Sequence, residues 1–185
     1  MKILSRLAFA VYAVTVLAAV ATAADVPKLP DETWAPLKME AGVWDAAVTY
    51  YADDKESGTG VGVQTNTLLA NGHWIVNDFT IPANGTFPVY QGHGVWGYDP
   101  VARTYVDTWV DTNDLAVRTD YGFWDAPSNT MSWSSKQPDG AGHFVDYRMV
   151  EEFKGDTRIL TFYQLGLLKP NQHILIRIVF TRRKA

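Results

Sequence analysis

The sequence contains no cysteine among its 185 residues. Disulfide bonds, thiol catalysis and metal sites built on thiolates are therefore excluded, and the hydrophobic core itself must stabilise the fold. A phosphate-binding loop is also missing, because Gly92, Gly94 and Gly97 lie in an expected strand that is followed by another strand, not by a helix. Glycines inside a strand more often mark a sharp bend of the sheet, or a place where another group approaches the backbone closely.

Basic residues are few and scattered, with 16 Lys and Arg against 20 Asp and Glu and a net charge of −4. Proteins that bind nucleic acid usually carry a basic face, so no nucleic-acid partner is expected. The four histidines are His73, His93, His143 and His173. None of them forms a local metal-binding motif with another, and we expect neither a metal ion nor a cofactor.

Long apolar runs are absent except near the N-terminus. Lys2 and Arg6 give this segment a positive start, an apolar run follows over 7–20, and small residues occupy 21–23. This order is typical of a secretory signal peptide, and the run is shorter than the ~20 apolar residues that a membrane-spanning helix needs. We therefore expect a signal peptide at 1–23, a periplasmic or secreted protein, and no stable membrane insertion after cleavage.

Turn-forming residues recur at regular intervals through the rest of the chain. Clusters of Gly, Pro, Asn and Asp separate short runs rich in Val, Thr, Tyr, Trp and Phe. The expected strands are 43–52, 60–70, 73–81, 88–98, 103–112, 116–125, 129–136, 143–153, 157–166 and 173–182. Ten short strands joined by tight turns favour an up-and-down antiparallel meander closed into a barrel, because closure leaves no unpaired edge strand. The predicted fold class is all-β, with a Pro-rich lead-in at 24–36 and one barrel domain at 37–185.

The pair Asn71-Gly72 is the strongest hairpin signal in the chain. It separates two apolar runs, and Asn-Gly is the preferred pair in a two-residue type I′ turn because both central residues need a positive φ. We therefore expect a tight type I′ hairpin at this position.

Alternation along two strands shows which side chains share a face. The last strand carries an apolar row made of Ile174, Ile176, Ile178 and Phe180. The fifth strand carries an aromatic and acidic row made of Tyr105, Asp107, Trp109 and Asp111. This second row either lines a polar cavity or lies on the solvated outside of the barrel, and alternation alone fits both.

The hairpin of the fourth and fifth strands holds the main candidate site. If Gly97 pairs with Tyr105, every second residue before Gly97 lies opposite every second residue after Tyr105, and all of these side chains share one face of the sheet. The resulting pairs are Val95 with Asp107, His93 with Trp109, and Gln91 with Asp111. This arrangement would group a base, an acid and an aromatic ring, as proton transfer or the binding of a polar ligand requires.

Three further polar residues lie on strand centres and would extend this site: Asn77, Tyr121 and Arg148. In an enzyme, the catalytic residues would be His93, Asp111 and Tyr121. The ligand-binding residues would be Trp109, Gln91, Asn77 and Arg148. Arg148 would hold an anion if it faces the interior, or pair with Asp146 or Glu151 if it faces solvent.

Five segments carry recognisable motifs: AGVW at 41–44, NGHWIVNDF at 71–79, QGHGVWGYDP at 91–100, YVDTWVD at 105–111 and GFWD at 122–125. With them the chain resembles a bacterial family of uncharacterised exported proteins, catalogued as a domain of unknown function. The resemblance runs from about residue 36 to the C-terminus. It implies a lipocalin-like or calycin-like barrel of about ten strands, and it implies no activity and no catalytic residues.

Three functions remain open from the sequence. The first is an exported barrel that holds a small apolar or aromatic molecule, which the barrel pattern and the 7 Trp and 9 Tyr favour. The second is a cofactor-free lyase, isomerase or hydrolase acting on a small aromatic substrate inside the barrel. The third is a module of the cell envelope that binds a partner through outer aromatic side chains.

Overall fold

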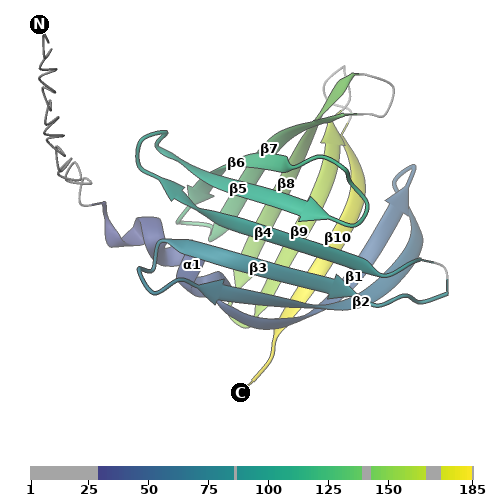
Figure 1. The fold of residues 1–185 in the computed structure, drawn as a ribbon, viewed down its shortest axis with the longest axis horizontal. Coiled ribbons are helices and arrows are strands. Elements are labelled where there is room, and N and C mark those ends of the chain that lie inside the picture. The colour runs from purple at the N-terminus through teal and green to yellow at the C-terminus, as the bar shows by residue number, and fades with distance from the viewer. Residues whose placement is uncertain (1–28, 86, 139–142, 166–171, 185) are drawn as a thin grey trace, which may run out of the picture.

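The computed structural model describes residues 29–85, 87–138, 143–165 and 172–184. Ten antiparallel strands in these ranges close into a barrel in which each strand pairs with its sequence neighbours, and β1 pairs with β10 (Figure 1). The strands are β1 (Gly42–Ala52), β2 (Lys55–Leu68), β3 (Trp74–Ile81), β4 (Tyr90–Asp99), β5 (Thr104–Asp111), β6 (Arg118–Asp125), β7 (Thr130–Pro138), β8 (Phe144–Lys154), β9 (Thr157–Leu165) and β10 (Gln172–Arg182). The prediction of an all-β, ten-stranded antiparallel barrel is confirmed, while the signal peptide expected at 1–23 lies outside the described residues.

The type I′ turn occurs at a different hairpin from the one predicted. Asp53 and Asp54, between β1 and β2, both have positive φ, 51° and 59°. At the expected position only Gly72 has a positive φ, and the backbone N–H of Leu69 donates to the carbonyl of Trp74 at 2.9 Å. The loop there spans 70–73 and is a longer hairpin, so the prediction of a two-residue turn was wrong.

The segment expected to be only a Pro-rich lead-in contains helical structure. A 3₁₀ helix, η1 (Asp31–Trp34), leads directly into α1 (Ala35–Glu40), which has a proline in its first turn. α1 lies at one end of the barrel (Figure 1), and its Leu37 is fully buried in a core cluster with Ile75 and Trp96. A six-residue helix is too short to show helical periodicity in the sequence, which explains why the pattern did not predict it.

Side chains from the barrel bind the C-terminal carbonyls of α1. Arg182 donates from Nη1 to the carbonyl of Ala41 at 2.6 Å and from Nη2 to that of Met39 at 2.5 Å. The indole of Trp44 donates to the carbonyl of Glu40 at 2.7 Å. These bonds satisfy carbonyls that a helix end leaves without partners, and they fix the position of Glu40.

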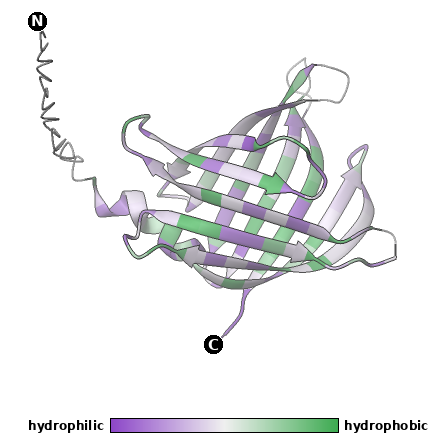
Figure 2. Ribbon diagram, viewed as in Figure 1, coloured by the Kyte–Doolittle hydropathy of each residue, from purple (hydrophilic) through white to green (hydrophobic). Residues whose placement is uncertain are grey.

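Hydrophobic and hydrophilic residues alternate along parts of the strands (Figure 2), and successive side chains of a strand point to opposite faces of the barrel wall. Ile178 and Phe180 of the predicted apolar row are buried inside, in a second core cluster with Trp44 and Val48. The row is interrupted by an irregularity between Ile174 and Ile176. None of the helices within the described ranges has the length and apolarity needed to span a membrane.

Candidate functional site

The barrel encloses a cavity of about 580 Å³. Glu40 of α1 lines it at one end, and Asn84, Phe87, Asn113 and Asp114, from the connections at the opposite end, line it as well. Ligand pockets for small molecules typically measure roughly 300–1,000 Å³. The interior is therefore large enough for one such molecule.

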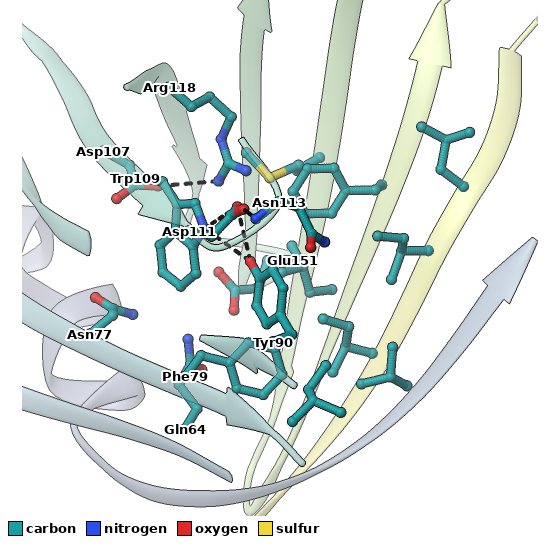
Figure 3. Close-up of a pocket in the computed structure, with 18 of the residues that line it drawn as sticks. Gln64, Asn77, Phe79, Tyr90, Asp107, Trp109, Asp111, Asn113, Arg118 and Glu151 are labelled. Carbon is teal, nitrogen blue, oxygen red and sulfur yellow. Dashed lines mark hydrogen bonds and ion pairs between the residues drawn. The ribbon is translucent and has the colours of Figure 1, made fainter. Parts of the chain in front are cut away.

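The cavity has an apolar side and a polar side. Most of the apolar lining comes from β1, β3, β9 and β10. It includes Val48, Phe79, Ile81, Leu160, Phe162, Leu175, Ile176, Ile178 and Phe180. The polar lining on β4, β5 and β6 consists of Tyr90, Asp107, Trp109, Asp111 and Arg118 (Figure 3). The structure thus shows that the aromatic and acidic row of β5 faces the interior.

Asp111 is the centre of a hydrogen-bonded group on the polar side. Its Oδ2 accepts hydrogen bonds from Trp109 Nε1 at 3.0 Å and from the Tyr90 hydroxyl at 3.2 Å. Its Oδ1 accepts from the backbone N–H groups of Asn113 at 2.8 Å and Asp114 at 3.1 Å. Four neutral donors therefore hold the carboxylate in one orientation in the cavity wall (Figure 3).

Two glycines of β4 make room for the indole of Trp109. A Cβ atom at Gly92 would lie 2.1 Å from Trp109 Cζ2, and a Cβ at Gly94 would lie 2.6 Å from Trp109 Cε3 and 2.8 Å from the carbonyl oxygen of Thr108. Of the two interpretations of these glycines, close approach of another group is the one seen here. The glycines thus determine where the ring that holds Asp111 can lie.

Replacing Gly94 with alanine should lower the free energy of unfolding by about 1–3 kcal/mol, because the added methyl group overlaps both a ring and a backbone oxygen. Urea unfolding followed by tryptophan fluorescence measures this loss. Gly60→Ala is the matched control, since a Cβ there meets nothing closer than Ile81 Cγ2 at 3.3 Å. Equal losses in the two variants would contradict the role assigned to Gly94.

A second polar group surrounds Arg118, whose Nε donates to Asp120 Oδ2 at 2.7 Å and whose Nη2 lies 3.8 Å from Asp107 Oδ2. The guanidinium also lies over the rings of Phe162 and Trp109, at 5.2 Å and 5.7 Å from the centroids. Burial raises the pKa of Asp107 well above its usual range, and the Asp120 carboxylate raises it further, while Arg118 opposes the shift. Asp107 therefore keeps its proton to a higher pH than an exposed aspartate does.

A third polar group occupies the end of the cavity next to α1. Arg158 Nη1 lies 2.8 Å from Glu40 Oε1 and 2.6 Å from Glu151 Oε1, and Arg158 also donates to Gln64. Asn77 donates to Glu40 Oε1 at 2.9 Å. All these side chains are buried, so a single cation is shared by two carboxylates away from solvent.

Burial determines the protonation of this group. It raises the pKa of Glu40 to about 7, and Arg158 opposes part of the shift. Burial raises the pKa of Glu151 as well, again against the attraction of Arg158. On the polar side, burial and the Asp111 carboxylate raise the pKa of the Tyr90 hydroxyl, which therefore remains a hydrogen-bond donor.

The predicted site residues divide between the two faces of the barrel. The cavity is lined by Asn77, Trp109 and Asp111. The other four face outward: Gln91, His93, Tyr121 and Arg148. The site expected from the sequence is therefore only partly assembled inside the barrel.

The predicted register between β4 and β5 was wrong by one residue. Tyr98, not Gly97, pairs with Tyr105, so His93 pairs with Val110 and Trp109 with Gly94. Because side chains alternate with a period of two, a slip of one residue moves His93 to the opposite face. The expected group of His93 with Trp109 and Asp111 does not form.

On the outer face, His93 makes a local pair. Its Nδ1 lies 2.7 Å from Asp78 Oδ1 on β3, with 55% of the histidine side chain exposed. Tyr121 on β6 is likewise 55% exposed, and Arg148 on β8 lies opposite Ser134 on the outer surface. Among the described residues, no group of three or more His, Asp or Glu side chains is placed to hold a metal ion.

Several interior polar residues were missed from the sequence, namely Glu40, Gln64, Tyr90, Arg118, Glu151 and Arg158. A signal for two of them does exist in the alternation pattern. Arg158 shares a face with Leu160 and Phe162 on β9, and Glu151 lies between Met149 and Phe153 on β8. A charged residue within an apolar row of a barrel strand indicates a buried charge that needs a partner.

A family model described as "Protein of unknown function (DUF1579)" matches residues 30–182. Among solved structures, the crystal structure of Rv2717c from M. tuberculosis is similar, with a TM-score of 0.60 and 8% identity over 82% of this chain and 98% of that chain. This likeness shows a shared fold. No curated protein matches the chain.

Proposed function

The chain belongs to the family of unknown function DUF1579, and from the cavity of this member we propose that the barrel binds one small molecule without covalent chemistry. The apolar or aromatic part of the ligand packs against the apolar side of the cavity, and its polar part contacts the side formed by β4, β5 and β6. Export, expected from the apolar run at 7–20, belongs to the same proposal and makes the protein a carrier or sensor outside the cytoplasm.

The observation that carries this proposal is the cavity itself, about 580 Å³ with many apolar side chains in its lining. Burying roughly 200 Å² of apolar ligand surface there would contribute about 5 kcal/mol. The loss of translational and rotational freedom on association costs an amount of the same order. Polar contacts must therefore contribute much of the net affinity and select the ligand.

Replacing Ile176 with tryptophan should lower the affinity for a neutral aromatic probe at least about tenfold, because the indole fills part of the cavity from β10. Fluorescence titration with N-phenyl-1-naphthylamine measures this affinity. The matched control is Val61→Trp, which adds the same side chain on the outer face, where Val61 is 71% exposed.

The control variant should bind the probe as the native protein does. Circular dichroism checks that both variants are folded. Equal binding by the two variants would place the probe outside the barrel and contradict the proposal, and so would a native protein that binds no probe.

A further inference from the structure

The carboxylate of Asp111 forms no ion pair with a cation of the described residues. Its four hydrogen-bond donors are two backbone N–H groups, the indole of Trp109 and the hydroxyl of Tyr90, and all four are neutral. Among the described residues, none of the ion pairs includes Asp111. The group is thus an anion that is held rigidly in a cavity wall and lacks a counterion.

The two arginines of the cavity do not pair with Asp111, because each one already faces two other acidic side chains. The two groups are Arg118 with Asp107 and Asp120, and Arg158 with Glu40 and Glu151. Asp114 adds a further carboxylate to the lining near Asp111. The cavity therefore has more acidic than basic groups.

The raised pKa values of three carboxyl groups in the cavity agree with this excess of acidic groups. Burial raises the pKa of Glu40, Glu151 and Asp107, and the arginines offset these shifts only in part. A positive charge brought into the cavity would favour the ionised form of all three side chains. Binding of a cation would therefore be accompanied by the release of protons.

Aromatic rings complete the surroundings of Asp111. The rings of Trp109 and Tyr90 lie beside the carboxylate, and Phe79 packs edge-on against Tyr90 at 5.9 Å between centroids (Figure 3). These rings place apolar surface directly next to the charged group.

From these contacts we infer that the ligand of the cavity is an organic cation, an ammonium group joined to an apolar or aromatic body, with the charge bound at Asp111 beside Trp109 and Tyr90. This inference rests on the proposed function and names its ligand class. The apolar body lies against β9 and β10, and Asp111 acts as the residue that determines specificity. An anionic ligand is disfavoured, because it would enter a cavity that is already acidic.

Three compounds of nearly the same shape test the inference: protonated 1-naphthylmethylamine, neutral 1-naphthylmethanol and anionic 1-naphthoate. Isothermal titration calorimetry at pH 7.5 should show the ammonium compound binding the native protein at least about tenfold more tightly than the alcohol, and the naphthoate binding most weakly. Repeating the ammonium titration in buffers of different ionisation enthalpy should reveal net proton release.

The variant Asp111→Asn should lose at least about tenfold in affinity for the ammonium compound while its affinity for the alcohol stays within about twofold of native. Asp78→Asn is the matched control, because it removes the same charge from the outer face, where it should leave all three affinities unchanged. Unfolding curves confirm that both variants are folded.

The possible outcomes separate the inference from the function on which it rests. Equal binding of ammonium and alcohol, or tightest binding of naphthoate, overturns the inference and leaves small-molecule binding intact. Failure of the ammonium compound to bind a protein that still binds N-phenyl-1-naphthylamine also overturns it. If no compound and no neutral probe binds, the proposed function fails, and the inference fails with it.

Discussion

Replacement of Arg158 by methionine should lower the free energy of unfolding by about 3–5 kcal/mol at pH 7.5. The substitution removes the one cation shared by Glu40 and Glu151, and it leaves both carboxylates buried. Methionine keeps most of the side-chain volume against Phe180, whose ring centroid lies 4.1 Å from the guanidinium carbon. The loss would therefore come mainly from the uncompensated charge and not from a cavity.

Urea unfolding followed by tryptophan fluorescence measures this loss. Arg148→Met is the matched control, since Arg148 lies exposed on the outer face of β8 and its replacement should cost less than about 0.5 kcal/mol. A triple variant that adds Glu40→Gln and Glu151→Gln should recover much of the lost stability, because no buried charge then lacks a partner. If Arg158→Met costs no more than Arg148→Met, the buried network does not stabilise the fold.

The native protein should lose stability as the pH rises from 5 to 8. The pKa of Glu40 is about 7 in the folded state against an ordinary value of 4.5, so the folded state binds this proton more tightly than the unfolded state does. The stability that this proton contributes is fully present below about pH 4.5 and is lost as the pH rises through 7. Its size is on the order of 3 kcal/mol.

Two other buried carboxyl groups also lower the stability of the folded state as the pH rises. Burial raises the pKa of Glu151 and of Asp107, so each of them also makes the folded state less stable as the pH rises. The exposed Asp45 and Asp54 have lowered pKa values because Arg183 and His173 pair with them, so they affect stability only at pH values well below 5, where the unfolded chain takes up protons on these side chains. Solvent screens these exposed pairs, so the buried acids should dominate the pH dependence.

Unfolding free energies measured at intervals between pH 5 and pH 8 test this prediction. Glu40→Gln should flatten the part of the curve around pH 7 by removing the contribution of Glu40, while the amide still accepts the hydrogen bond from Asn77. Glu152→Gln makes the same change at a partly exposed position on β8 and should keep the native slope. A native protein that becomes more stable from pH 5 to pH 8 would show that Glu40 is ionised in the fold.

The prediction from sequence succeeded where the signal was local. Turn residues such as Gly155 and Asn129 adopt positive φ between strands, and each of the ten expected strands is present. The largest error in a boundary is at β2, which begins at Lys55 and not at residue 60. Gly58 and Gly60 near its start have no strand propensity, and their pairing with β1 is imposed by the turn at Asp53 and Asp54.

The site was predicted less well, because its composition depends on register and on contacts between distant parts of the chain. Alternation correctly placed Trp109 and Asp111 on one face of β5, since it is a local property, but it did not decide whether that face lies inside the barrel. His93 was misplaced because one residue of register decides the face. Arg158 and Gln64 are 94 residues apart in the sequence, and no pattern within either strand predicts their contact.

The sequence by itself therefore determined the fold class, the number of strands, and the order in which they pair, because turns and alternation act over a few residues. The tertiary structure decided which face of each strand is interior, how α1 closes one end of the barrel, and which charges share the cavity. Those features follow from pairing register and from the cost of burying charge without a partner, and both depend on the closed barrel as a whole.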